Sequence, residues 1–245
     1  MIPYFEQPVW SAGPFTISGF GLCLVAALWL GRFLMTSRAA GLALDRGVAA
    51  DFWRGAVVAG LMGSIAGGVA LGEEGRWPLS SAGGLIGGLL GGAYALRPAG
   101  LARDKALAFV DAAAFVFPWP WALFRLGCFL AHDHLGPPSS LWIAVDFPAG
   151  PRLDLGLIEC LFMFGLGWVY LALDRSPRAP GFYLVATLFV YGPLRLALAP
   201  LRAGSAAGDL VLAAGCLAGG WWVLRRPLCP RGSEGDSHQI RNRPQ

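Results

Sequence analysis

Long apolar stretches alternate with short polar segments along most of the chain. Seven of these stretches are about 20 residues long, the length that an apolar helix needs to cross the hydrocarbon core of a bilayer. They span residues 16–36, 51–72, 79–96, 105–124, 155–173, 181–200 and 209–224. The pattern predicts an all-α polytopic membrane protein with about seven transmembrane helices.

Composition excludes several other classes of protein. Of the 245 residues, 56% are hydrophobic and only 14% are charged, whereas a soluble domain has about 25% charged residues. The net charge of +4 is spread over the ends of the apolar stretches and forms no continuous basic face, which argues against nucleic acid as a partner. The five cysteines are widely spaced with no CxxC pair, so they indicate neither a disulfide framework nor a zinc knuckle. The expected surroundings are therefore the membrane bilayer.

The basic residues predict the orientation in the membrane. If the seven stretches cross in turn, 12 Lys and Arg residues fall on the side of the carboxy terminus and five on the opposite side. By the positive-inside rule the amino terminus lies outside and the carboxy terminus is cytoplasmic. The first ten residues contain no Lys or Arg, so we expect the first stretch to be retained as a helix. Residues 1–225 are predicted to form a single transmembrane domain, and residues 226–245 a disordered, basic cytoplasmic tail.

Two of the stretches contain helix-modifying residues. Glycine pairs recur every four residues in the third stretch, at Gly83-Gly84 and in the next two turns, and such a face lets another backbone approach closely. The fourth stretch contains Pro118 and Pro120, which should kink or break its helix. Broken helices inside a membrane usually line a polar cavity.

Arginines in the apolar part of the chain are candidates for binding an anion. Arg125 has no carboxylate four residues away, and Arg195 and Arg202 are two helical turns apart, on one face if the helix continues. Guanidinium groups match phosphate oxygens, so Arg125 and Arg195 could clamp a lipid phosphate; alternatively, each arginine extends to the interface as a topology anchor. We expect Glu159 to orient Arg125 or Arg195, and Asp111 to form a structural hydrogen bond.

The segment His132-Asp133-His134 directly follows the predicted break. Imidazole titrates near neutrality, so a general acid or base role fits these residues. A metal site completed by Asp154 and Glu159 is a weaker interpretation, because two histidines one residue apart are a poor metal signature. Two solvated loop histidines remain the alternative. We predict no metal and no cofactor.

A longer motif surrounds these residues. The motif begins with Arg125-Leu-Gly127-Cys128-Phe129 and continues to Gly136, with Asp133 at an acidic position. It resembles the signature of the prolipoprotein diacylglyceryl transferases, which are seven-helix bacterial enzymes. The resemblance covers nearly the whole chain. It also includes Phe20-Gly21-Leu22, Ser81-Ala82-Gly83-Gly84-Leu85-Ile86-Gly87, Arg152, Leu157, Glu159, Arg195 and Arg202.

The chain departs from this family at several hydrogen-bonding positions. Ala82 stands where the family usually has histidine, Cys128 where it has asparagine, and Phe20 where it has tyrosine. Leu153 replaces a histidine, and Ala199 replaces an acidic residue between the two arginines. The arginines expected to bind phosphate are retained, whereas several of their partners are not.

The resemblance implies transfer of the diacylglyceryl group from phosphatidylglycerol to the lipobox cysteine thiol of exported prolipoproteins, at the outer side of the bacterial inner membrane. The substrate supplies the nucleophile, so the enzyme needs to hold the phosphate and accept a thiol proton. The residues implied to be catalytic are Arg125, Arg195, His132, His134 and Asp133. Those implied to bind substrate are Arg125, Arg195, Arg202, Glu159, Arg152, Gly83, Gly84 and Gly136.

Three other functions remain open. Ala82, Cys128 and Ala199 favour a degenerate homologue that binds lipid or lipoprotein without catalysis. Buried arginines would also suit a small transporter or channel for an anion. A metal-dependent intramembrane hydrolase would depend on His132 and His134.

Overall fold

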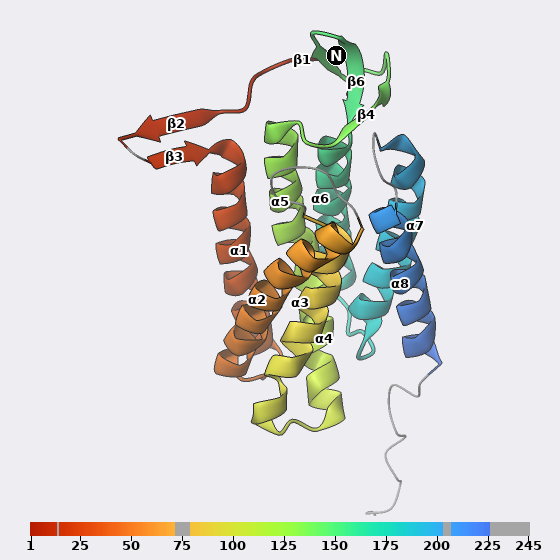
Figure 1. The fold of residues 1–245 in the computed structure, drawn as a ribbon. Coiled ribbons are helices and arrows are strands. Elements are labelled where there is room, and N and C mark those ends of the chain that lie inside the picture. Colours follow the sequence, from red (N-terminus) through yellow and green to blue (C-terminus); the bar gives the residue numbers. More distant parts are fainter. Residues whose placement is uncertain (14, 72–78, 203–206, 226–245) are drawn as a thin grey trace, which may run out of the picture.

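The protein is mostly helical (Figure 1), and its computed structural model describes residues 1–13, 15–71, 79–202 and 207–225. The predicted cytoplasmic tail, residues 226–245, lies outside the described residues. The helices are α1 (Gly19–Gly41), α2 (Arg46–Ala70), α3 (Ser81–Ala95), α4 (Arg103–Val116), α5 (Pro118–Ala131), α6 (Leu155–Leu173), α7 (Phe182–Leu198) and α8 (Ala207–Leu224). Short 3-10 turns follow α3 at Arg97–Ala99 and α7 at Ala199–Leu201.

Four helices begin at a polar side chain that accepts a hydrogen bond from the first turn. Ser18 caps α1, Asp45 caps α2 and Ser80 caps α3, in each case by accepting from the backbone N–H three residues later. Asp154 caps α6 through the backbone N–H groups of the second and third residues after it. Such caps replace the backbone partners that a first helical turn lacks.

Within the described residues, five helices are long and apolar enough to cross a membrane: α1, α2, α6, α8, and α7 with its 3-10 turn. A sixth span results if the bent pair α4 and α5 is counted as one. The prediction of seven spans is therefore supported only in part. The third predicted stretch yields α3, a helix of 15 residues, which covers only about 22 Å of the roughly 30 Å hydrocarbon core.

The predicted break in the fourth stretch is confirmed. Helix α4 ends at Val116, α5 begins at Pro118, and their axes differ by 42°. The proline at the first position of α5 lacks the N–H that a continuous helix would require. Because α5 continues to Ala131, the segment His132-Asp133-His134 directly follows its last turn.

The prediction of an all-α fold was wrong for one end of the molecule, where short strands lie above the helices (Figure 1). The chain forms a four-stranded sheet in the order β1 (Ile2–Pro3), β5 (Val145–Phe147), β6 (Gly150–Asp154), β4 (Leu135–Pro138), and a hairpin of β2 (Val9–Ala12) with β3 (Phe15–Ser18). These strands have two to five residues. Runs this short, and interrupted by proline, give little alternation of polar and apolar positions from which to predict a strand.

The glycine pairs of α3 pack against α2, as the sequence predicts. A Cβ atom added to Gly83 or Gly87 would overlap the backbone carbonyls of Gly63 and Ala59, and one added to Gly67 would overlap Gly83. The two backbones are therefore in direct contact with no side chain between them.

Candidate functional site

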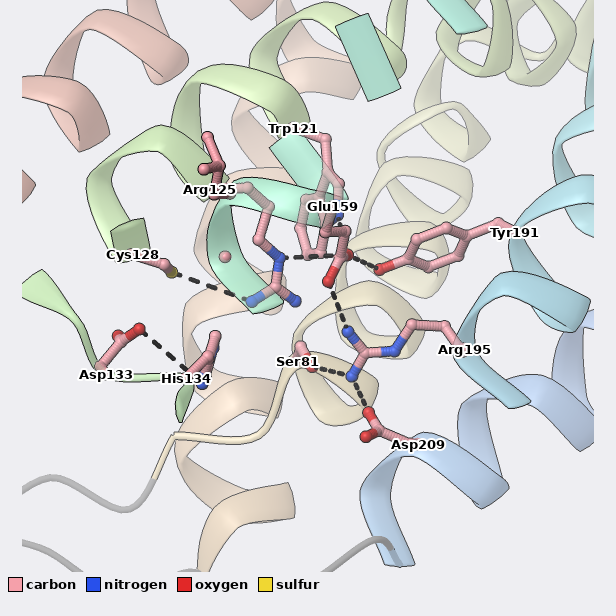
Figure 2. A network of polar contacts seen from close by, with 12 residues as sticks. Ser81, Trp121, Arg125, Cys128, Asp133, His134, Glu159, Tyr191, Arg195 and Asp209 are labelled. Atoms are coloured by element: carbon pink, nitrogen blue, oxygen red, sulfur yellow. Dashed lines mark hydrogen bonds and ion pairs between the residues drawn. The ribbon is translucent and has the colours of Figure 1, made fainter. Parts of the chain in front are cut away.

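Glu159 of α6 is the centre of a buried polar network, shown in Figure 2. Its Oε1 accepts hydrogen bonds from Trp121 Nε1 at 2.9 Å and from the Tyr191 hydroxyl at 2.7 Å, and it lies 3.1 Å from Arg125 Nε. Its Oε2 accepts from Arg195 Nη1 at 2.9 Å. The expectation that Glu159 orients one of these arginines is confirmed, and the carboxylate in fact contacts both. Arg125 therefore has an acidic partner, although none lies near it in sequence.

Arg195 of α7 connects this centre to α3 and α8. Its Nη2 donates to Ser81 Oγ at 3.0 Å and also contacts the carboxylate of Asp209, a buried residue in the first turn of α8. Asp209 Oδ1 lies 3.3 Å from Arg202 Nη1. Two buried or half-buried guanidinium groups thus share one carboxylate.

The network returns to Arg125 through the segment after α5. Arg202 Nη2 lies 3.1 Å from His134 Nδ1, and this nitrogen lies 3.7 Å from Asp133 Oδ1. Arg125 Nη1 in turn lies 3.8 Å from Cys128 Sγ, a neighbour of Asp133. The contacts form a closed circuit that we call the polar ring, consisting of Arg125, Glu159, Arg195, Asp209, Arg202, His134, Asp133 and Cys128.

The buried part of the polar ring carries an excess of positive charge. Three guanidinium groups face two buried carboxylates, those of Glu159 and Asp209. Arg125 is 1% exposed, yet its Nη2 has no hydrogen-bond partner among the residues that the structure describes. A buried donor without a partner costs about 1–3 kcal/mol, so a ligand that accepts this hydrogen bond would be stabilised. A cavity of only about 10 Å³ lies within the ring, lined by His134, Leu155, Glu159, Arg195, Leu198, Arg202 and Asp209.

The two titratable groups after α5 are shifted toward their neutral forms. Burial, reinforced by the charges of Arg125 and Arg202, lowers the pKa of His134 to about 2. Burial also raises the pKa of Asp133, although the charge of Arg125 opposes this effect. At neutral pH His134 is therefore a neutral imidazole with a lone pair for a proton or a hydrogen bond.

His132 lies outside the polar ring. Its Nδ1 is 2.9 Å from Asp154 Oδ2 and its Nε2 is 3.1 Å from the Phe5 carbonyl oxygen, and its ring contacts the aromatic rings of Tyr4 and Phe147. Both ring nitrogens are engaged in joining α5 to the amino-terminal segment and to the cap of α6. These contacts give His132 a supporting position in the fold.

Four predicted substrate-binding residues also lie outside the ring: Arg152, Gly136, Gly83 and Gly84. Arg152 Nε donates to the Gly136 carbonyl oxygen at 2.9 Å, within the strand region. Gly83 packs against α2, and so does Gly84, whose added Cβ would make ordinary contact with Ser64. The expected hydrogen bond of Asp111 is present, since its Oδ1 accepts from the Leu184 N–H at 2.9 Å.

Arg195 and Arg202 do not share one α-helical face. Helix α7 ends at Leu198, the chain continues as a 3-10 turn, and Arg202 has extended backbone. The two guanidinium groups instead meet at Asp209. The sequence reasoning missed Asp209 and Ser81 as members of this network, although an aspartate at the start of an otherwise apolar stretch was a usable signal.

Fold and site together define an integral membrane protein with a cation-rich polar centre buried in its helical bundle. A sequence profile described as prolipoprotein diacylglyceryl transferase matches residues 7–224. The chain belongs to this family, which confirms the resemblance seen in the sequence. The family is a transferase family that acts in lipoprotein diacylglyceryl transfer. None of the curated proteins compared with the chain matches it significantly.

Proposed function

We propose that the protein transfers the diacylglyceryl group of phosphatidylglycerol to the lipobox cysteine thiol of exported prolipoproteins and releases glycerol phosphate. The observation that carries this proposal is buried Arg125, whose Nη2 has no hydrogen-bond partner among the described residues, in the part of the ring where three guanidinium groups face two buried carboxylates. A phosphodiester headgroup has a single negative charge and oxygens that accept hydrogen bonds from guanidinium groups. It would offset the excess charge of this buried part and supply the missing acceptor.

In this proposal Arg125 and Arg195 hold the phosphate, and Glu159 fixes the spacing of the two guanidinium groups. The sulfur of the lipobox cysteine attacks the carbon of the diacylglyceryl group that is joined to the phosphate oxygen. The bond between this carbon and the oxygen breaks, and its electrons leave with glycerol phosphate. The two arginines stabilise the negative charge that develops on this leaving group. The cavity is small for a ligand site, so the side chains of the ring must shift to admit a headgroup.

His134 is the base in this proposal, because it lies in the ring whereas His132 does not. Its Nδ1 faces Arg202. A phosphate that draws Arg202 toward itself would free the lone pair of this nitrogen. The added negative charge would also raise the pKa of His134 from its low value in the free protein. His134 would then take the thiol proton as the sulfur attacks, and Asp133 would stabilise the imidazolium.

The orientation and the compartment belong to the same proposal. We place the amino terminus and the polar ring toward the outer side of a bacterial inner membrane, with seven crossings if the short helix α3 spans together with its flanking residues. The uneven distribution of basic residues supports this orientation. Exported precursors reach that side of the membrane.

A second candidate is a homologue that binds the lipid without transferring it. Ala82, where the family usually has histidine, is 1% exposed and packs in the hydrophobic core. No titratable side chain therefore replaces the missing histidine at that position. Under this alternative, lipid binding persists without any product.

The test measures transfer directly. The full-length protein is placed in phosphatidylglycerol liposomes with a lipobox peptide, and peptide mass is followed by spectrometry. We expect a diacylglyceryl increment that requires the peptide cysteine, that disappears in Arg125→Ala and His134→Ala, and that persists in Arg46→Ala, an exposed arginine at the start of α2. Liposomes of phosphatidylethanolamine test the donor. No increment from folded protein that retains phosphatidylglycerol would reject catalysis and favour the second candidate.

A further inference from the structure

Cys128, Asp133 and His134 form a compact group of three different metal-ligating side chains. Their sulfur, carboxylate oxygen and imidazole nitrogen all lie within 4.8 Å of one another. The group differs from the metal site considered from the sequence, since His132, Asp154 and Glu159 have other partners. It includes the cysteine that stands at the family's usual asparagine position.

The backbone at the end of α5 brings the three residues together. His132 has a left-handed conformation with φ of 51°, and the Asp133 N–H donates to the Cys128 carbonyl oxygen at 3.4 Å. This is the hydrogen bond of a Schellman motif, in which the chain folds back over the last turn of a helix. The Leu155 N–H donates to the His134 carbonyl oxygen at 2.9 Å, which fixes the other end of the segment. The group is therefore held in place before any ligand binds.

The donor set matches a divalent cation that prefers sulfur. A thiolate, a carboxylate and a neutral imidazole supply two negative charges, and zinc sites commonly combine these ligand types. Tetrahedral ligands of zinc lie about 3.5 Å apart, so small side-chain rotations would close the present spacing. The Asp133 side chain is 43% exposed, which gives a cation access from one side.

The surrounding charges set a limit on affinity. Arg125 Nη1 lies 3.8 Å from the Cys128 sulfur and Arg202 Nη2 lies 3.1 Å from His134 Nδ1. The first contact stabilises a thiolate, whereas both guanidinium groups repel a cation. A metal would also compete with Arg202 for the imidazole. These charges favour a divalent ion with strong thiolate bonds over Mg²⁺ or Ca²⁺, which bind through oxygen.

We propose that Cys128, Asp133 and His134 bind one divalent cation of the zinc type. On binding, the Cys128 thiol loses its proton to solvent, the metal loses water molecules, and a fourth position stays open to water. This binding does not depend on the proposed transferase activity. If that activity is present, the metal would inhibit it by withdrawing His134.

Cobalt is the probe for the experiment, because Co²⁺ bound to a thiolate has a charge-transfer absorption that Zn²⁺ removes by displacement. Titration of the purified full-length protein should give this absorption with one equivalent of Co²⁺. Cys128→Asn, which installs the residue usual in the family, should abolish it, and Asp133→Asn should weaken binding by more than about tenfold. The control variant is Cys160→Ala, which removes a cysteine of the apolar helix α6 without adding a polar side chain there. It should retain the absorption.

Two results would overturn the proposal. One is folded protein without thiolate absorption at saturating Co²⁺. The other is thiolate absorption that survives in Cys128→Asn, or Co²⁺ affinity that is unchanged in Asp133→Asn. Both readouts are spectroscopic and need no lipid or peptide, so they stand apart from the outcome of the transfer assay.

Discussion

Replacing Glu159 with glutamine removes one negative charge from the polar ring while nearly preserving the shape of the side chain. Arg195 keeps Asp209 and Ser81 as partners, but Arg125 loses its only ion pair within the described residues. The amide nitrogen would also face a donor, because both carboxylate oxygens now accept hydrogen bonds. Breaking a buried ion pair in this way costs about 3–5 kcal/mol. At this size of protein the cost corresponds to a fall in Tm of about 6–20 °C.

The assay is thermal and denaturant unfolding of the detergent-solubilised protein, with Glu6→Gln as the matched control because Glu6 is exposed. The control should change the free energy of unfolding by less than about 0.5 kcal/mol. The double variant Glu159→Gln with Arg125→Gln should be more stable than Glu159→Gln alone, because the uncompensated charge is removed as well. A Glu159→Gln protein as stable as the parent, or a double variant less stable than the single one, would show that Glu159 does not compensate a buried charge.

Three further predictions concern contacts outside the ring. Arg38 pairs with Asp174 at 2.6 Å and lowers the pKa of that carboxyl. This pair therefore contributes stability above about pH 4, and that stability is lost as pH falls through the folded-state pKa of Asp174. The difference in Tm between the parent and Asp174→Asn should shrink as pH is lowered from 7 to 3. A difference in Tm that does not change with pH would contradict this prediction. His132→Ala removes two hydrogen bonds, so it should lower the free energy of unfolding by about 1–3 kcal/mol and lower Tm accordingly. It should leave residual transfer in the liposome assay. Complete loss of transfer in folded protein would instead indicate that His132 is catalytic. Gly83→Leu should prevent stable folding by overlap with Gly63, whereas Gly165→Leu, where an added Cβ meets nothing, should express as a monodisperse protein in gel filtration.

The sequence was most informative where one physical requirement decides the structure. Apolar length predicted the long helices, and the two prolines predicted the break between α4 and α5, because neither depends on distant residues. The strands at one end were missed because their pairing joins β1 to β5 across more than 140 residues, and the pattern within each strand is too short to indicate this.

The polar ring, too, could be predicted from the sequence only in part. The need for a buried arginine to have an acidic partner predicted the pairing of Glu159. Sequence could not show that Arg195 and Arg202 share Asp209, because that contact depends on the end of α7 at Leu198 and on how α8 packs against α7. The contacts of His132 and His134 likewise differ, and the left-handed residue that turns the chain back over α5 contributes to this difference.

The direct backbone contact between α2 and α3 has a consequence for the evolution of this protein. Every amino acid that can replace a glycine adds at least a β-carbon, and at Gly63, Gly83 and Gly87 that atom would overlap a carbonyl of the opposite helix. No substitution at these three positions therefore leaves the spacing of the two helices unchanged. The pair α2 and α3 should consequently diverge slowly among relatives of this chain, and the residues around the last turn of α5 are where new chemistry can arise.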